Sequence, residues 1–363
     1  SQSRLQGVQH MADSAQPQLS ALASQLLAAA DGPEEELRNT AREVAKALAI
    51  AGKAAPAKSK RQDAKDAGGD KKRRKHSAAV CLGMMQGHAG TVASLAVLSP
   101  TRVASASYDK TIKIWDTAAK KCIATLEGHT NWVLSITTLS GNKIASASGD
   151  KTVKVWDVDK ASCIHTFEGH SGTVSEVAAL GETQLVSASY DNSIRVWDLE
   201  SKRQVATLEG HTDPVLSVTA LGTTQLASGS RDKSIKVWSV DDGKCLSTFE
   251  AHRDWVTHVV AMSRDWVTSV DRLASCSQDK TIKIFAGPNV ESWRCILTFD
   301  TKGPVLCLAF LGPGRLASGS SDGALKFWDI DAEKCMATVQ AHSNWVRCVA
   351  HLSAGQTASG SEG

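Results

Sequence analysis

Short runs of apolar and polar residues, of the kind that form β-strands, follow one another along most of this chain of 363 residues. The clearest stretch covers residues 128–157 and reads GHTNWVLSITTLSGNKIASASGDKTVKVWD. It holds three runs rich in Val, Ile, Leu, Thr and Ser, separated by the turn sequences SGN and GD. Such runs between turn pairs are typical of strands joined by tight turns. The stretch therefore predicts a small antiparallel β unit.

This stretch recurs as an internal repeat. Gly-His or its equivalent opens each copy at intervals of 41 residues, with one interval of 49, at His88, His129, His170, His211, His252, Thr301 and His342. An aspartate precedes the third run at Asp109, Asp150, Asp191, Asp232, Asp279 and Asp322. An aromatic residue closes that run at Trp115, Trp156, Trp197, Trp238, Phe285 and Trp328. Most of the chain is thus made of copies of one unit.

The repeat resembles that of the WD-repeat (WD40) β-propeller family, with Gly-His at one end and Trp-Asp at the other, at 115–116, 156–157, 197–198 and 328–329. The resemblance covers residues 79–363 and implies an all-β, seven-bladed propeller. Each repeat would make a four-stranded blade with both faces buried. For the second copy this implies strands at 133–138, 143–147, 152–156 and 162–167.

The seventh copy is incomplete, because the chain stops where its aspartate and third strand should come. Residues 78–86 (AAVCLGMMQ) resemble a fourth strand without the three that precede it. In this family an N-terminal strand completes the last blade, so we expect 78–86 to do so. A sequence fragment truncated at its C-terminus explains the missing strand; otherwise the last blade would carry exposed strand edges.

The recurring His, Asp, Ser and Trp could suggest catalysis, but six hydrolase triads in one chain are implausible. In the family these residues form a structural hydrogen-bonded tetrad, and in the second blade it would comprise His129, Asp150, Trp156 and either Ser146 or Ser148. The tetrad residues expected in the first four blades are His88, Asp109, Trp115, His129, Asp150, Trp156, His170, Asp191, Trp197, His211, Asp232 and Trp238.

Two blades depart from this pattern. Phe285 in the fifth lacks an indole donor, and Thr301 replaces the sixth histidine, so we expect partial networks there. The fifth blade also has six extra residues between His252 and Asp279, with RDWVTHV at 253 echoed by RDWVTSV at 264. This insertion is expected to form a loop between the first two strands, on the bottom face of the propeller.

Family resemblance places partner contacts on the top face, at residues before the first strand and before the turn aspartate. These are Thr91, Trp132, Thr173, Pro214, Trp255, Pro304 and Trp345, then Tyr108, Gly149, Tyr190, Arg231, Gln278 and Ser321. Because Trp, Tyr and Arg dominate binding hot spots, the preferred contacts are Trp132, Trp255, Trp345, Tyr108, Tyr190, Arg231, Arg253 and Gln278. The alternative is that each tryptophan packs on its own blade.

An N-terminal extension precedes the repeats. Residues 1–53 predict two short amphipathic helices, which could form a hairpin, dock on the propeller, bind a partner helix or remain a loose tail. Residues 54–78 have the composition of a disordered basic linker. Lys71, Lys72, Arg73, Arg74 and Lys75, with an earlier basic cluster at 58–61, resemble a bipartite nuclear-localisation signal for an import receptor. Weak polyanion binding by a solvated linker is the alternative.

Composition narrows the function. The net charge is +5 over residues 1–80 and −2 over the remainder, so nucleic acid is disfavoured as the main ligand of the propeller. No apolar run is long enough to span a membrane, and the first residues do not resemble a secretory signal. Five of the nine cysteines (Cys122, Cys163, Cys245, Cys295 and Cys335) recur at one repeat position, which favours small packed residues and a reducing compartment, cytoplasm or nucleus.

No motif for a metal, a cofactor, a small-molecule substrate or a nucleophile is present. We therefore expect a non-catalytic scaffold or adaptor that binds proteins or peptides on the top face of the propeller. A substrate-recognition subunit of a ubiquitin ligase and a nuclear ribonucleoprotein-assembly protein are the alternatives, and an enzyme is the least favoured.

Overall fold

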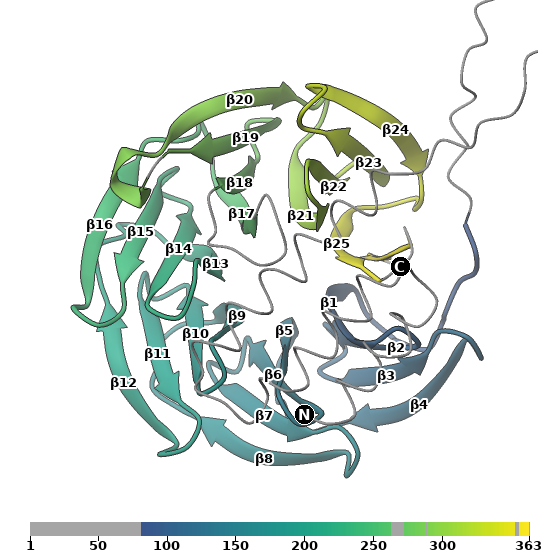
Figure 1. Cartoon of the computed structure of the whole chain (residues 1–363). Helices are drawn as coiled ribbons and strands as arrows, with labels where there is room; N and C mark the ends of the chain where they lie inside the picture. The colour runs from purple at the N-terminus through teal and green to yellow at the C-terminus, as the bar shows by residue number, and fades with distance from the viewer. Residues whose placement is uncertain (1–80, 263–271, 288, 353–355, 363) are drawn as a thin grey trace, which may run out of the picture. The chain divides into compact units, whose positions relative to one another are not determined.

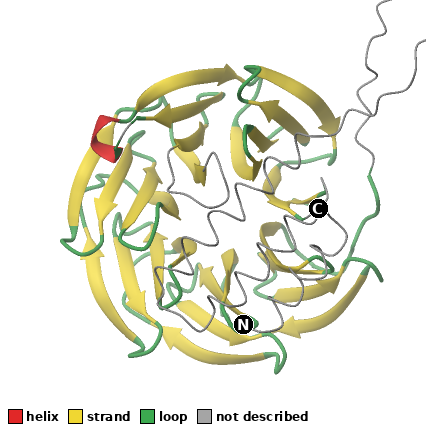
Figure 2. Cartoon of the chain, viewed as in Figure 1, coloured by secondary structure: helices red, strands yellow, loops and turns green. Residues whose placement is uncertain are grey.

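The repeats fold into six four-stranded antiparallel sheets and one two-stranded sheet (Figures 1 and 2). The computed structural model describes residues 81–362 apart from 263–271, 288 and 353–355. All of these belong to the second of two units, His76–Gly363. The predicted helices of residues 1–53, the linker at 54–78 and its basic residues Lys71–Lys75 lie outside the described residues.

Each sheet runs in chain order from the centre of the ring outward. The innermost strands are β1 (Val92–Ser99), β5 (Val133–Leu139), β9 (Val174–Leu180), β13 (Val215–Ala220), β17 (Val256–Met262), β21 (Val305–Gly312) and β25 (Val346–His351). The second strands are β2 (Arg102–Ser107), β6 (Lys143–Ser148), β10 (Gln184–Ser189), β14 (Gln225–Ser230), β18 (Arg272–Ser277), β22 (Arg315–Ser320) and β26 (Thr357–Ser361).

Six blades continue with third and fourth strands. The third strands are β3 (Ile112–Asp116), β7 (Val153–Asp157), β11 (Ile194–Asp198), β15 (Ile235–Ser239), β19 (Thr281–Ala286) and β23 (Ala324–Asp329). The outer strands are β4 (Lys121–Leu126), β8 (Ser162–Phe167), β12 (Arg203–Leu208), β16 (Lys244–Phe249), β20 (Arg294–Asp300) and β24 (Lys334–Gln340). One 3₁₀ turn, η1 (Val290–Ser292), precedes β20. No α-helix occurs among the described residues.

The blades stand around a ring, and each innermost strand packs against the next (Figure 1). The last pair is β25 against β1, so the ring closes through its inner strands. The hydrophobic clusters lie between neighbouring blades. One of them joins Ile112 and Ile114 of the first blade to Val133 and Ile144 of the second. A β-propeller of seven repeats was predicted, and this arrangement confirms it.

Polar side chains also tie the innermost strands together. The Oγ of Ser94, Ser135 and Ser217 each accepts a hydrogen bond from a backbone N–H of the following blade, at 3.3, 3.3 and 3.0 Å. Glu176 does the same for Val218 at 2.7 Å, and its second oxygen lies 3.3 Å from Nε2 of His258, two blades away. Neighbouring blades are therefore joined by hydrogen bonds as well as by apolar contact.

The repeat boundaries were predicted closely for the second blade. Its outer strand, Ser162–Phe167, agrees with the prediction at both ends. The first two strands are one residue longer than predicted, and the third is shifted by one residue. The six-residue insertion falls between Met262 and Arg272, at the predicted junction of the first two strands of the fifth blade. The inserted residues themselves lie outside the described part of the chain.

Two expectations were wrong. Residues 81–86 do not form the strand predicted to complete the last blade. A fourth strand needs the hydrogen bonds of a third, and the described part of this blade has only β25 and β26. The five repeated cysteines are exposed on the outer strands instead of packed. There the first half of each strand faces solvent, and Cys163 Sγ contacts the carbonyl of His165, at 3.4 Å.

Glycine replaces alanine where blades approach most closely. The last residue but one of the second strand is alanine in the first three blades (Ala106, Ala147 and Ala188) and glycine in the fourth, sixth and seventh (Gly229, Gly319 and Gly360). A Cβ on Gly319 would lie 2.6 Å from both Val346 Cγ1 and Cys307 Sγ. The glycine therefore makes room for the buried thiol of Cys307, whose pKa is raised by burial and which contacts the carbonyl oxygen of Val346 at 3.6 Å.

We expect Gly319→Ala to lower the free energy of unfolding by about 1–3 kcal/mol, because it overpacks the interface of the sixth and seventh blades. Gly303→Ala is the matched control, since the nearest atoms to its Cβ would be 3.9 Å away. Urea unfolding of both variants measures the difference. Equal stability of the two would show that this interface can relax around a methyl group.

Candidate functional site

The residue before the first strand and the residue after the second meet at one end of every blade, and all of these except Glu362 were predicted top-face positions. In each, the N–H of the residue after the second strand donates to the carbonyl of the residue before the first. The pairs are Tyr108–Thr91, Gly149–Trp132, Tyr190–Thr173, Arg231–Pro214, Gln278–Trp255, Ser321–Pro304 and Glu362–Trp345, at 2.9–3.3 Å. We call this end of the propeller the top face. One backbone bond per blade thus sets these side chains side by side.

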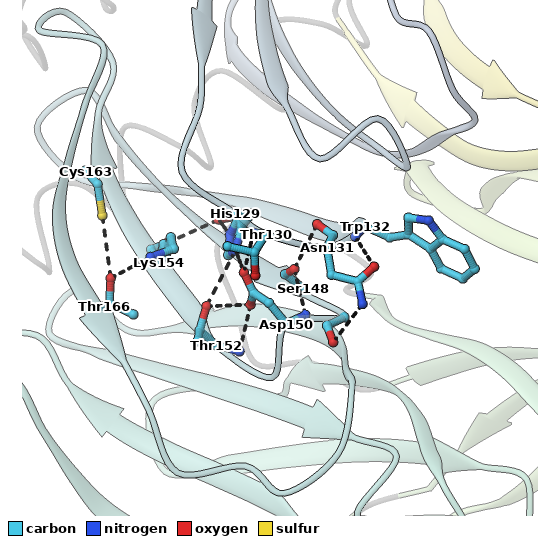
Figure 3. A network of polar contacts seen from close by, with 12 residues as sticks. His129, Thr130, Asn131, Trp132, Ser148, Asp150, Thr152, Lys154, Cys163 and Thr166 are labelled. Carbon is cyan, nitrogen blue, oxygen red and sulfur yellow. Dashed lines mark hydrogen bonds and ion pairs between the residues drawn. The ribbon is translucent and has the colours of Figure 1, made fainter.

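A buried polar network supports this face from below, as Figure 3 shows for the second blade. His129 Nδ1 lies 2.7 Å from Asp150 Oδ2, and His129 Nε2 lies 2.7 Å from Ser146 Oγ. Trp156 Nε1 donates to the same Ser146 Oγ at 2.8 Å. Ser146 is therefore the fourth member of the network. Ser148, the other candidate, accepts from the N–H of Asp150 and donates to the carbonyl of Asn131.

The same contacts occur in the other three blades for which a full tetrad was expected. They join His88, Asp109, Ser105 and Trp115 in the first, His170, Asp191, Ser187 and Trp197 in the third, and His211, Asp232, Ser228 and Trp238 in the fourth. The Asp also accepts the N–H that follows the histidine and a Thr or Ser hydroxyl two residues on. The network holds the turn before the third strand against the loop that enters the blade.

The remaining blades hold incomplete networks. In the fifth, His252 contacts Asp279 at 3.0 Å and Ser275 at 2.7 Å, while Phe285 offers no N–H. In the sixth, the Thr301 hydroxyl contacts the carbonyl of Lys280, at 2.7 Å, and Trp328 still donates to its serine. In the seventh, His342 contacts Ser359 at 2.8 Å.

Electrostatics favours a neutral histidine and an ionised aspartate in these networks. Burial lowers the pKa of His88, His170 and His252, and outweighs the nearby carboxylate that would raise it. Burial would raise the pKa of Asp109, but hydrogen bonds from Thr111 and His88 hold it at about 2. Nδ1–H of each histidine then donates to the carboxylate and Nε2 accepts from the serine hydroxyl.

This order of Asp, His and Ser is also that of a hydrolytic triad. Here, however, the serine side chains are almost wholly buried, with Ser146 at 0% exposure, and each accepts a tryptophan N–H. A substrate carbonyl would have to displace that indole to reach the hydroxyl. The network therefore has a structural role. Among the described residues, no group of His, Cys, Asp and Glu could hold a metal ion.

Arg231 of the fourth blade lies between aromatic side chains of its two neighbours. Its guanidinium carbon is 4.8 Å from the ring centroid of Tyr190 and 4.2 Å from that of Trp255. One of its terminal nitrogens donates to the Tyr190 hydroxyl at 3.2 Å. Both aromatic residues are 40% exposed. Three of the predicted contact residues thus form one cluster across three blades.

Two smaller groups lie elsewhere on the top face. Tyr108 stacks on Trp132, with ring centroids 4.7 Å apart and planes inclined by 9°. The indole of Trp132 is 51% exposed and points away from the polar network below it (Figure 3). Trp345 is 41% exposed and lies 4.6 Å from the guanidinium carbon of Arg347. The tryptophans therefore pack on neighbouring top-face side chains and still present surface.

The remaining predicted contacts are more isolated. Arg253 is exposed and its N–H donates to Asp279, and Gln278 is partly buried. Sequence reasoning missed Arg347 and Glu362, which form an ion pair at 2.6 Å. Glu362 could have been found, because it follows SGS in the last repeat as Arg231 does in the fourth. Arg347 could not have been found, because a residue within a first strand gives no sign in the sequence that its side chain lies over Trp345.

Comparison with known proteins agrees with the geometry. The sequence model of the WD domain, G-beta repeat, matches residues 79–116, 120–157, 161–198, 202–239, 243–285, 293–329 and 333–363. The chain belongs to the WD-repeat family. WD-repeat propellers generally serve as non-catalytic platforms for protein interaction.

Similarity to individual relatives is confined to a short segment. Nuclear distribution protein nudF 1 of Talaromyces marneffei is 42% identical over 80 residues, which are 21% of this chain and 17% of that protein. Nuclear distribution protein PAC1 of Arthroderma otae is 35% identical over 85 residues, 21% of this chain and 18% of that protein. The WD-repeat chain therefore spans less than a fifth of the length of these relatives.

Asp150→Ala should lower the free energy of unfolding by about 2–4 kcal/mol, because it leaves His129 and two backbone N–H groups without their acceptor. Asp322→Ala is the matched control and should cost on the order of 1 kcal/mol, since that aspartate has no histidine to bind. Chemical denaturation of the two variants gives both values. A cost for Asp322→Ala as large as for Asp150→Ala would contradict this role of the network.

Stability should fall as the pH falls. Because the pKa values of His170 and His252 are lowered in the folded chain, the unfolded chain binds more protons below about pH 6.5, the ordinary pKa of histidine. The aspartates add a second loss below about pH 3.8, which continues to the folded pKa of Asp109 at about 2. Thermal unfolding from pH 7.5 to pH 3 measures both. His170→Gln should be less stable at pH 7.5 and lose less between pH 7.5 and 5.5; an unchanged slope would argue against histidine linkage.

Proposed function

We propose that this WD-repeat protein is an interaction scaffold or adaptor that binds protein or peptide segments on the top face of its propeller. The observation that carries this proposal is the exposed cluster of Tyr190, Arg231 and Trp255. Tryptophan, tyrosine and arginine are enriched among the few residues that carry most of the binding energy at protein interfaces.

Rigid support strengthens the proposal. The backbone bond between paired top-face residues and the buried networks below fix the loops that carry the aromatic rings. Tyr108 and Trp132 already stack on each other, and Arg231 is held by two rings before any partner arrives. A preorganised surface of this kind loses less entropy on association.

The described residues carry no feature specific to a ubiquitin-ligase subunit or to ribonucleoprotein assembly, so the proposal is limited to protein binding. No helix in the described part of the chain is long and apolar enough to cross a membrane. An import receptor acting through Lys71–Lys75 remains a separate prediction, because those residues lie outside the described part of the chain. The names of the relatives refer to nuclear distribution, and a partner connected with that process is one candidate class.

The triple variant Trp132→Ala, Trp255→Ala, Arg231→Ala should lose most of the proteins that the wild-type chain captures from cell extract. A control variant, Ile123→Ala, Ile164→Ala, Arg203→Ala, removes exposed apolar area and one charge from the outer strands and should keep them. Affinity purification with quantitative mass spectrometry compares the three chains. An unchanged set of partners for the top-face variant would refute the proposal, provided that the melting temperatures agree.

A further inference from the structure

We infer that Arg231 is an anchor for a carboxylate, so that the partner segment bound on the top face is acidic. This inference rests on the proposed function and adds the chemistry of its partner. Three observations support it: the unsatisfied donors of the guanidinium, the lack of an opposing charge, and the two rings that hold the group in place.

Most donors of Arg231 are unused. A guanidinium has five N–H groups. One terminal nitrogen donates to Tyr190, while the Nε atom is buried and has no hydrogen-bond partner among the described residues. Because Nε is enclosed, an incoming acceptor would use the terminal N–H groups that the contact with Tyr190 leaves unused. The site therefore selects for a ligand that accepts several hydrogen bonds.

The positive charge of Arg231 is also not balanced by any described carboxylate. None of the described carboxylates forms an ion pair with it, whereas Arg347, the other arginine stacked on a top-face tryptophan, is paired with Glu362 at 2.6 Å. Asp232, the next residue in the chain, is occupied by His211 and Ser234. Of these two stacked arginines, Arg231 is thus the one whose charge is open to a partner.

The positive charge of Arg231 selects for an anion, and the flanking rings orient the guanidinium for a carboxylate. They fix the plane of the guanidinium, so its parallel N–H groups are set for the two oxygens of an Asp or Glu side chain. A lysine or arginine of the partner would be repelled. Because Tyr190 and Trp255 are each 40% exposed, they also offer apolar surface beside the charge. The expected partner sequence places an acidic residue next to an apolar one.

A library of random 16-residue peptides displayed on phage tests this inference. Selection uses the full wild-type chain alone, and the enriched peptides are then tested on Arg231→Met. We expect the enriched peptides to carry Asp or Glu beside an apolar residue. A synthetic peptide from that set should bind the wild-type chain at least tenfold more tightly than Arg231→Met, measured by fluorescence polarisation. Arg203→Met removes an exposed arginine from the outer strand β12 and should leave the affinity unchanged.

A double-mutant cycle then identifies the paired group. Replacing the acidic residue of the peptide by its amide should cause a loss similar to that of Arg231→Met, and the two changes together should lose little more. Arg231→Lys keeps the charge without the fork and should bind with intermediate affinity. Near-UV circular dichroism and the melting temperature show that each variant is folded.

The outcomes separate the inference from the proposed function. Enriched peptides without acidic residues, which bind Arg231→Met as well as the wild type but fail to bind the triple top-face variant, overturn the acidic partner and leave the scaffold in place. Peptides that bind the triple variant unchanged, or no enrichment at all, count against both. Independent losses in the double-mutant cycle would likewise overturn the pairing of Arg231 with a carboxylate.

Discussion

The structure depends on one constraint: every blade is apolar on both faces, so each must be covered by a neighbour. The first valine of each innermost strand shows this directly. Val133, Val174, Val215, Val256, Val305 and Val346 have no exposed surface. Val92, at the junction where the seventh blade has two described strands, is only partly buried. Closure at that junction still brings the seventh blade against the first, where Cys348 Sγ contacts the carbonyl oxygen of Val92 at 3.6 Å. Because the thiol pKa is raised to about 12 by burial, Cys348 stays protonated and can donate there.

Packing between blades sets the distance between neighbouring blades but does not fix the conformation of the loops at the top face. The polar networks restrain those loops. His129 joins the loop that enters the blade to the turn at Asp150, while Trp156 anchors the shared serine from the third strand. Four ionised, hydrogen-bonded carboxylates are tolerated near the interior because each is surrounded by donors. The same arrangement makes the networks sensitive to acid, since burial lowers the pKa of His88 and His170.

Most of the fold could be predicted from the sequence, because the same strand boundaries recur in each copy of the repeat. The prediction of a strand at 78–86 was wrong because strand pairing is not a local property. A fourth strand needs a third strand with which to form hydrogen bonds. The prediction that the repeated cysteines are packed was wrong for a related reason. Their spacing identified the strand, but its exposure depends on its being outermost. For the site, the sequence identified Tyr190, Arg231 and Trp255 as top-face residues. That they contact one another is seen only in the packing of three successive blades.

The polar networks of these three blades differ in completeness beneath the cluster. Arg231 belongs to the fourth blade, the last in chain order with a complete network, and Trp255 opens the fifth, where Phe285 has replaced the indole donor. Tyr190 stands on the third blade, which is complete. The guanidinium therefore lies between a loop held by a complete polar network and a loop held by an incomplete one. A partner that binds Arg231 would also contact the exposed indole of Trp255, so binding would add to the fifth blade a restraint that its own network lacks.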